Sequence, residues 1–249
     1  MAVCEAPGLK IRYREWGADH TGDPIVLVHG AASGSATFLD LGRRLGARHR
    51  TIALDLPGHG QSPKVSHAIS IEAYRDLVGW LCAQLGLSRA ILVGHSMGGA
   101  IALEAALSWP EKVGGVVMLG AGAQLPGGPP DDYTRLDDLF AKMCYAAATP
   151  RELAERWARV SVVAAPDVAR ADFEACARWD ARDRVLSLRV PLVVVGGDED
   201  LMVAPRHPAW LAEHAPGAQL LRLANAGHNL HHEHPDAVVQ AVLDFASQS

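Results

Sequence analysis

A serine that lies midway between two glycines is the first candidate for chemistry in this sequence. Ser96 stands two residues after Gly94 and two before Gly98, just after an apolar run. A serine hydroxyl is a poor nucleophile unless it is exposed, held in place and deprotonated by a neighbour. A tight turn from a strand into a helix would expose it, and side chains at the two glycine positions would obstruct that turn. We therefore predict that Ser96 is a nucleophile; the alternative is a glycine-rich turn that serves packing alone.

A base for this serine is expected late in the chain. His228 stands between the last strand-like run and the last helical pattern, where its ring could take the serine proton. His231, His232 and His234 crowd the same segment, so a metal site is the alternative. His228 and His232 would share a helix face, but a glycine before and a proline after this segment indicate a loop that enters a helix. We therefore favour a general base over a metal ligand.

Three carboxylates could orient that base. Asp198, Glu199 and Asp200 follow the apolar run 191–195, at the place where a strand would end. A carboxylate that accepts a hydrogen bond from an imidazole fixes the tautomer of the ring and stabilises the imidazolium that forms. The residue types alone leave the choice open. The carboxylates that are not used would lie on a solvated loop.

Short β-rich runs alternate with longer helical patterns along most of the chain. Apolar residues at three- and four-residue spacing predict a helix over residues 70–85, and further helices are expected over 97–107 and 235–246. Pro7 and Gly8 could turn an antiparallel hairpin. The runs interpreted as strands are 9–14, 25–28, 50–54, 90–93, 113–119, 191–195 and 219–223. This alternation is typical of an α/β fold with a mostly parallel sheet flanked by helices.

The alternation breaks between residues 124 and 188. A breaker cluster at 125–130 opens this stretch, and a helical pattern follows. We interpret it as a helical cap inserted into a single domain whose core is residues 1–123 and 189–249. Its aromatic residues are Tyr133, Phe140, Tyr145, Trp157, Phe173 and Trp179. Phe140, Trp157 and Trp179 are expected to contact a substrate, although packing of the cap on the sheet would explain them equally well.

With these motifs in this order, the chain resembles the α/β-hydrolase family from about residue 9 to residue 245. His29 and Gly30 match the family's oxyanion loop, and residues 55–62 match its D-x-P-G-x-G-x-S loop. The resemblance implies a mostly parallel sheet of eight strands with flanking helices. His29 itself, like His95 beside the serine, is expected to be structural rather than a second base.

The resemblance also implies roles for single residues. The backbone N–H groups of Ala31 and Met97 would form an oxyanion hole, in which fixed donors stabilise the charge that develops on a carbonyl oxygen. The family's acid falls in a G-x-x-D pattern, which selects Asp200 over Asp198. The dehalogenases and epoxide hydrolases of this fold have an aspartate where Ser96 stands, so those reactions are excluded.

The expected activity is hydrolysis of carboxylic esters of small to medium acyl groups through an acyl-enzyme. The same residues would serve a lactonase, a C–C bond hydrolase or a cofactor-free perhydrolase, and the fold does not select among them. A non-catalytic ligand-binding protein on the same scaffold is the remote alternative, which a missing acid or base would have indicated. Nothing implies a cofactor or a metal. The expected partner is a small-molecule ester.

Composition sets few further limits. The 249 residues fit one large domain, and a formal net charge of −5 gives no reason to expect nucleic acid or a membrane as a partner. No apolar run approaches the roughly 20 residues that span a bilayer, and the N-terminus has no signal pattern. The cysteines are widely scattered, which favours reduced thiols and makes the cytoplasm the default location. The oligomeric state is not predicted.

Overall fold

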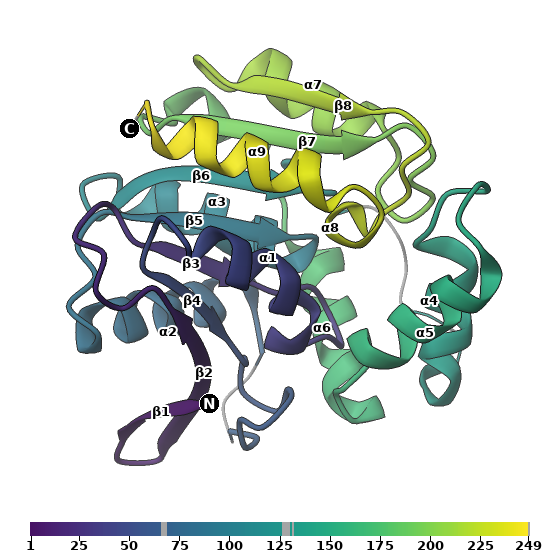
Figure 1. Cartoon of the computed structure of the whole chain (residues 1–249), viewed down its shortest axis with the longest axis horizontal. Helices are drawn as coiled ribbons and strands as arrows, with labels where there is room; N and C mark the ends of the chain where they lie inside the picture. The colour runs from purple at the N-terminus through teal and green to yellow at the C-terminus, as the bar shows by residue number, and fades with distance from the viewer. Residues whose placement is uncertain (66–68, 126–129, 131, 249) are drawn as a thin grey trace.

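Eight strands form one sheet in the order β1-β2-β4-β3-β5-β6-β7-β8 (Figure 1). The computed structural model describes residues 1–65, 69–125, 130 and 132–248. The strands are β1 (Ala2–Ala6), β2 (Leu9–Trp16), β3 (Ile25–Val28), β4 (Thr51–Leu54), β5 (Ala90–His95), β6 (Val113–Leu119), β7 (Leu192–Gly197) and β8 (Gln219–Leu223). β2 is antiparallel to β1 and β4, and all neighbours from β4 to β8 are parallel. The mostly parallel eight-stranded sheet is thereby confirmed.

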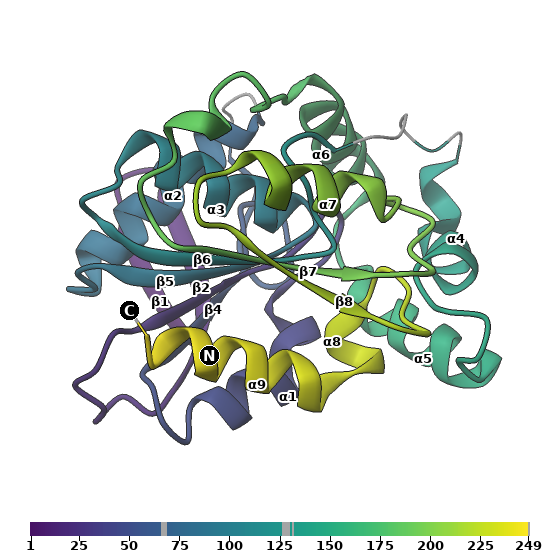
Figure 2. The same cartoon turned by 90° about the horizontal axis from the view of Figure 1, so that it is seen from above.

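Helices cover both faces of this sheet (Figure 2). On one face lie α2 (Ile71–Gln84), α3 (Met97–Ser108) and α7 (Arg206–His214), and on the other lie α1 (Leu39–Leu45) and α9 (Pro235–Ala246). Every residue of β3, β5 and β6 is buried, which explains why these strands are apolar without alternation. In the described part of the chain, no helix has the length and apolarity needed to cross a bilayer.

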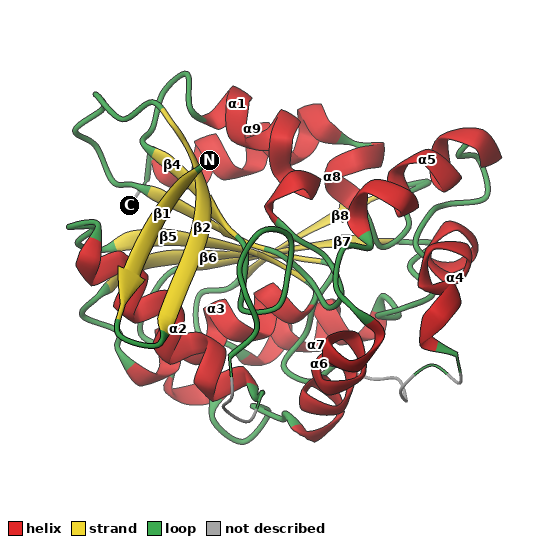
Figure 3. Cartoon of the chain, turned by 90° about the horizontal axis from the view of Figure 1, so that it is seen from below, coloured by secondary structure: helices red, strands yellow, loops and turns green. Residues whose placement is uncertain are grey.

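The elements agree closely with the sequence-based predictions. β6, β8 and α9 have the predicted bounds, and the hydroxyl of Ser70 caps α2 by accepting an N–H of its first turn at 3.1 Å. β5 runs two residues further than predicted because Gly94 and His95 still pair with β6. The β1–β2 hairpin turns at Pro7 and Gly8, where Gly8 has φ 76°, and it forms the edge of the sheet seen in Figure 3.

Helices α1, α7 and α8 (Leu230–Glu233) were not predicted. α1 has 7 residues and α7 has 9, so each offers too few turns for an apolar period to stand out. α8 is a single turn that directly follows the segment of His228. The loop expected before the last helix therefore contains one helical turn, which carries His231 and His232.

Residues 124–188, which we call the helical insertion, lie between β6 and β7. They contain α4 (Leu136–Met143), α5 (Arg151–Ser161) and α6 (Pro166–Arg178), with short 3-10 helices at Tyr133–Arg135 and Val185–Ser187. Apolar side chains of α4, α5 and the start of α6 form a separate cluster, whereas Cys176, Trp179 and Val185 pack with the core that contains α2 and α3. Figure 1 shows these helices beside the ends of the strands toward which the arrows point. Of the predicted breaker cluster, residues 126–129 lie outside the described residues.

Candidate active site

Ser96 lies in the turn between β5 and α3. Its backbone has φ 52° and ψ −117°, a conformation that costs a non-glycine residue about 1–3 kcal/mol and is typical of functional sites. The turn is as crowded as predicted. A Cβ on Gly94 would lie 2.1 Å from the carbonyl oxygen of Gly98, and a Cβ on Gly98 would lie 2.0 Å from that of Val28. The turn therefore places Ser96 just past the carboxyl end of β5.

His228 and Asp200 form a buried pair. His228 Nδ1 lies 2.8 Å from Asp200 Oδ2, and the two side chains are only 5% and 1% exposed. The other oxygen of Asp200 accepts the N–H groups of Met202 and Val203, both at 2.8 Å. Because the carboxylate is an acceptor, Nδ1 of His228 must be the donor. With its proton on Nδ1, the ring can accept a further proton at Nε2.

The structure separates the three carboxylates after β7. Asp198 is exposed to solvent. Glu199 Oε2 accepts the N–H of Ala147 at 2.7 Å, in the loop between α4 and α5. Of these three described side chains, Asp200 is the one that pairs with His228.

The cavity beside Ser96 brings together segments that are distant in sequence. It is lined by Gly30, Ala31, Ser33, His95, Ser96, Phe140, Ser161, Phe173, Met202, His228 and Asn229. Its volume is about 30 Å³, which is room for roughly one or two water molecules. Gly30 lies directly against the serine, since a Cβ on Gly30 would be 3.2 Å from Ser96 Cβ. The predicted nucleophile, base and oxyanion loop therefore share one space.

Hydrogen bonds fix the direction of the Ala31 N–H. His29 Nε2 accepts the N–H of Leu56 at 3.0 Å, so its proton is on Nδ1, which donates to the Gly30 carbonyl at 2.9 Å. The N–H of Ser33 donates to the same carbonyl at 3.2 Å. The Gly30–Ala31 peptide is trans, so the Ala31 N–H points away from this fixed carbonyl. Burial lowers the pKa of His29 to about 3, which keeps the ring neutral.

Met97 offers a second N–H next to the serine. It is the first residue of α3, where no carbonyl of the helix can accept its N–H. The N-terminal end of a helix also carries a partial positive charge that favours an anion. The two predicted oxyanion donors therefore come from different elements, the loop after β3 and the start of α3.

The loop that carries His228 is held from two sides. The N–H groups of His228 and Asn229 donate to the carbonyl of Cys144 at 3.0 and 2.9 Å, in the helical insertion. On the core side, His95 Nε2 donates to the His228 carbonyl at 3.0 Å. Burial holds the pKa of His95 well below its usual value, so this ring is neutral. His95 thus supports the backbone of the predicted base, as a structural residue would.

The remaining histidines of this segment have partners within the protein. His231 Nε2 lies 2.9 Å from the hydroxyl of Thr37, and His232 Nε2 lies 3.2 Å from its carbonyl. The ring of His232 also stacks on Trp157 at 5.3 Å. His234 Nε2 lies 3.0 Å from a backbone carbonyl. Within the described residues, no three His, Cys, Asp or Glu side chains are grouped as metal ligands.

Of the three aromatic residues expected to contact a substrate, Phe140 lines the cavity beside Ser96. Trp157 and Trp179 are not among the residues that line it. Trp157 is stacked on Tyr145 at 5.6 Å. Trp179 is buried against α3, where its indole N–H donates to Glu104 at 3.0 Å. Both rings thus have packing partners, as in the alternative that the sequence left open, and their contact with a substrate stays a prediction.

Several polar residues at the site had no predicted role. Ser161 and Asn229 line the cavity. Glu233 accepts the N–H groups of Ala146 and Gly227, both at 2.7 Å, and so joins the helical insertion to the loop of His228. Asn229 and Glu233 adjoin the predicted base in sequence, which is a usable signal. Ser161 lies in the insertion, and nothing in the sequence tells which face of its helix points inward.

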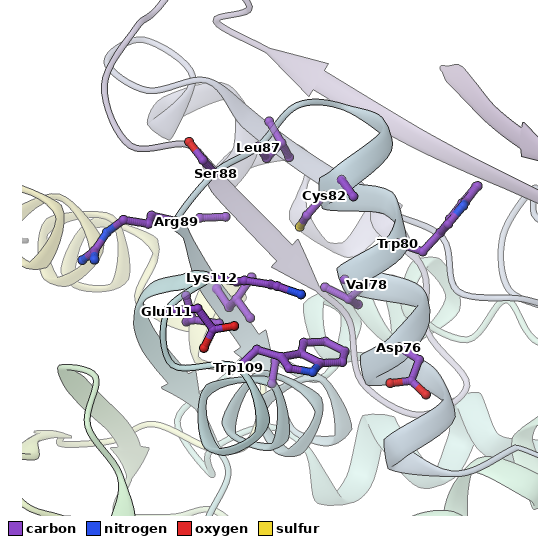
Figure 4. Close-up of a pocket in the computed structure, with 16 residues that line it drawn as sticks. Asp76, Val78, Trp80, Cys82, Leu87, Ser88, Arg89, Trp109, Glu111 and Lys112 are labelled. Atoms are coloured by element: carbon purple, nitrogen blue, oxygen red, sulfur yellow. The ribbon is translucent and has the colours of Figure 1, made fainter.

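A larger cavity of about 560 Å³ lies at the other end of the sheet (Figure 4). Trp80 and Cys82 of α2, together with Trp109 after α3, line it close to Ala90, where β5 begins. Ser96 instead follows the carboxyl end of the same strand. In open parallel sheets the carboxyl ends of the strands are the usual place for catalysis, so we assign the active site to the smaller cavity.

The buried neutral histidines predict acid sensitivity of the fold. Burial lowers the pKa of His29 to about 3 and that of His232 to about 4, and it holds those of His95 and His231 well below 6.5. Below pH 6.5 the unfolded chain therefore binds more protons than the folded one, so the free energy of unfolding falls as the pH falls. Each histidine contributes about 1.4 kcal/mol per pH unit.

Urea unfolding at pH 7.5, 6.0 and 5.0 measures this effect. The His231→Asn variant removes one of the four groups and should show a shallower dependence of unfolding free energy on pH. Equal stability of the wild type at pH 7.5 and 5.0 would contradict the prediction.

Comparison with known proteins establishes the family. The model of the "Alpha/beta hydrolase family" matches residues 25–241, which include the whole site described above. The chain belongs to this family. Fold, motif order and site geometry agree with that membership.

Three curated relatives differ widely in the activities that their names give. The chain is 34% identical over 92% of its length to polyketide synthase ThaQ of Burkholderia thailandensis, of which it spans only 12%. It is 30% identical to the dihydrolipoyllysine-residue acetyltransferase component of an acetoin cleaving system from Pseudomonas putida, covering 97% of this chain and 68% of the relative. It is 28% identical to 2-hydroxy-6-oxo-6-phenylhexa-2,4-dienoate hydrolase of Burkholderia cepacia, covering 90% and 87%.

Among solved structures, the enol-lactonase of Burkholderia xenovorans is similar throughout. It superposes with a TM-score of 0.91 and 23% identity, covering 99% of this chain and all of that one. At this identity the likeness supports the fold and not a shared substrate.

Proposed function

We propose that this protein is a serine hydrolase that cleaves carboxylic esters of small to medium acyl groups, with the helical insertion as its cap. Ser96 is the nucleophile, His228 the general base and Asp200 the residue that orients the base. The observation that carries the proposal is the buried contact of 2.8 Å between His228 Nδ1 and Asp200 Oδ2 at the cavity that Ser96 lines.

In the first step, His228 Nε2 takes the proton of Ser96 while Oγ attacks the carbonyl carbon of the ester. Negative charge moves to the carbonyl oxygen, where the N–H groups of Ala31 and Met97 stabilise it. Each such donor lowers the barrier by about 3 kcal/mol. His228 then gives its proton to the alcohol oxygen as the C–O bond breaks, which leaves the acyl group on Ser96.

In the second step, water replaces the alcohol. His228 takes a proton from the water as its oxygen attacks the acyl carbon, and the same two N–H groups stabilise the second oxyanion. The proton then returns to Ser96 Oγ as the acid leaves. The cavity of about 30 Å³ has room for that water but not for an ester. The cap must therefore move away from Ser96 when substrate enters.

Hydrolysis of p-nitrophenyl acetate and butyrate tests the proposal, with mass spectrometry after treatment with a fluorophosphonate. We expect turnover, and a single covalent label on the peptide that contains Ser96. Turnover without a label on that peptide would show that the nucleophile lies elsewhere. Neither turnover nor label, with any ester, would favour a non-catalytic ligand-binding protein on this scaffold.

A C–C bond hydrolase is the second candidate, because the relative from Burkholderia cepacia is named as the hydrolase of an oxygen-rich dienoate and is matched over most of its length. Ser161 and Asn229 would supply hydrogen-bonding groups for an oxygen-rich substrate of this kind. A ring-cleavage dienoate assayed beside the p-nitrophenyl esters separates the two. A kcat/KM that is at least 100-fold higher for the dienoate would favour the second candidate.

The Asp200→Asn variant is expected to lower kcat by about 10⁴-fold. The amide retains the shape of the carboxylate, but an NH₂ group that faces Nδ1 of His228 cannot accept a hydrogen bond from it. The ring then adopts the tautomer with its proton on Nε2, which cannot take the proton of Ser96. Asp198→Asn is the matched control, because that carboxylate is exposed, and its kcat should stay within about threefold of the wild type. Equal losses in the two variants would refute the assignment of Asp200.

A further inference from the structure

A buried carboxylate of the helical insertion reaches the loop that carries Ala31. Asp172 on α6 is 0% exposed. Its Oδ2 accepts the N–H of Ala32 at 3.0 Å and lies 2.7 Å from His59 Nε2, while Oδ1 accepts the hydroxyl of Tyr74 at 2.8 Å. One side chain of the insertion is therefore bonded to three separate segments of the core.

The partner of Asp172 carries a positive charge. His59 Nδ1 lies 3.0 Å from the carbonyl of Pro57, and Nε2 faces the carboxylate. Neither acceptor has a proton to give, so both ring nitrogens donate and the imidazole is charged. Burial opposes that charge, but the carboxylate of Asp172 outweighs it and raises the pKa of His59. Asp172 and His59 thus form an ion pair in the interior, in which neither charge is left uncompensated.

Ala32 is held in a backbone conformation that alanine rarely adopts. Its φ is 59°, in the left-handed region, where a non-glycine residue stays only if its surroundings hold it there. Its N–H donates to Asp172, and its carbonyl accepts the N–H groups of Val163 and Ala164 at 2.9 and 3.1 Å. All three of these partners belong to the insertion. The peptide that follows Ala31 is thereby fixed, as the peptide before it is fixed by the Gly30 carbonyl.

We propose that Asp172 is a positioning residue for the oxyanion hole, which holds the Ala31 N–H in its productive direction through the next peptide group. Asp172 is not among the residues that line the cavity, so it acts through the loop and not on the substrate. The inference rests on the proposed function, because it assumes that the Ala31 N–H stabilises an oxyanion. The insertion would then contribute to the chemical step as well as to the pocket.

The Asp172→Asn variant tests this role. Asparagine has the same size but no negative charge to pair with His59, and its NH₂ group must replace one carboxylate oxygen, either the one facing Ala32 and His59 or the one facing the Tyr74 hydroxyl. We expect kcat to fall about 10- to 100-fold while KM changes less than about threefold, because the oxyanion exists only in the transition state and the intermediates. Inhibition by a trifluoromethyl ketone, which becomes tetrahedral when the serine adds to it, should weaken by a similar factor.

Glu104→Gln is the matched control. Glu104 on α3 is also a buried carboxylate, 2% exposed, and it also ties the core to the insertion, by accepting from Trp179 at 3.0 Å and from Arg184 at 2.8 and 2.7 Å. It has no bond to the oxyanion loop among its described contacts. We expect this variant to have a lower Tm and a kcat within twofold of the wild type.

The outcomes separate positioning from general loss of stability. A folded Asp172→Asn protein with wild-type kcat, or one whose loss equals that of Glu104→Gln, would overturn the inference. Should Asp172→Asn not fold, His59→Gln retains a donor to Asp172 but removes the charge, and its kcat should fall in the same direction with KM preserved. A folded His59→Gln protein with unchanged kcat would overturn the inference as well.

A readout that does not depend on turnover keeps the two proposals distinct. The backbone amide signals of Ala31 and Ala32 should shift and exchange faster with solvent in Asp172→Asn, but not in Glu104→Gln. If the wild type hydrolyses esters and these signals do not change, the positioning role is wrong while the proposed function stands. If the signals change but no ester is hydrolysed, the proposed function fails and the oxyanion role of Asp172 fails with it.

Discussion

The Ser96→Ala variant is expected to lower kcat for ester hydrolysis by about 10⁵- to 10⁶-fold, with little change in KM. The alanine removes the attacking oxygen, so no acyl-enzyme can form. The pocket that binds the ester is untouched, which is why ground-state binding should survive. Steady-state kinetics with p-nitrophenyl butyrate, at protein concentrations high enough to detect residual turnover, measure the loss.

A double variant shows whether the serine and the histidine act as one unit. His228→Ala alone should cost about as much as Ser96→Ala, and the double variant should be no slower than either single one. Ser88→Ala, at the far end of the sheet beside the larger cavity, is the control and should keep wild-type kcat. Retention of more than a few per cent of activity in His228→Ala would contradict the assignment of the base.

The Gly98→Ala variant is expected to lose about 3 kcal/mol of unfolding free energy, the upper end of the usual cost of overpacking. The added Cβ would lie 2.0 Å from the carbonyl oxygen of Val28 and 2.8 Å from that of His29. These are backbone atoms of β3 and of the loop that follows it, so the clash can be relieved only if the strand moves. Because that loop leads to Ala31, the fraction that still folds should also have a reduced kcat.

Thermal unfolding and kinetics of the folded fraction measure both effects. At this chain length, each kcal/mol lowers Tm by roughly 2–4 °C. Gly22→Ala is the matched control, because among the described residues the nearest atom to the added Cβ lies at 4.0 Å. A Gly98→Ala protein as stable as Gly22→Ala would mean that the turn can widen, and the reason given for its glycines would be wrong.

The sheet and its helices could be predicted because their patterns are long or strongly apolar. β6, β8 and α9 were placed to the residue, since a covered strand or an amphipathic helix shows its burial in its composition. α1 and α7 were missed because a helix of two or three turns presents no clear period. The pairing of β1 with β2 is local and had a signal in Pro7 and Gly8, whereas the strand order depends on contacts between distant segments. The family resemblance supplied the number of strands and their mostly parallel arrangement, which periodicity could not.

The site was predictable to the extent that its residues lie in local motifs. The turn at Ser96, the position of His228 after the last strand and the choice of Asp200 each have a sequence signal. Asp172 has none: it is one acidic residue in a polar helix, and only the folded chain shows that it reaches Ala32. The substrate contacts could not be chosen from the sequence for a related reason, because Trp157 and Trp179 reveal their aromatic character there but not the side of the insertion they face.

The insertion is bonded to both halves of the site, through the Cys144 carbonyl to the loop of His228 and through Asp172 to the loop of Ala31. A lid that is joined to the core only by the chain at its two ends could be exchanged between relatives without affecting the core. Here a chimera that received a foreign segment in place of residues 124–188 would also receive new supports for its base and its oxyanion donor. Selectivity and turnover rate would then change together, and graft design would have to retain those two attachment points before altering the wall at Phe140.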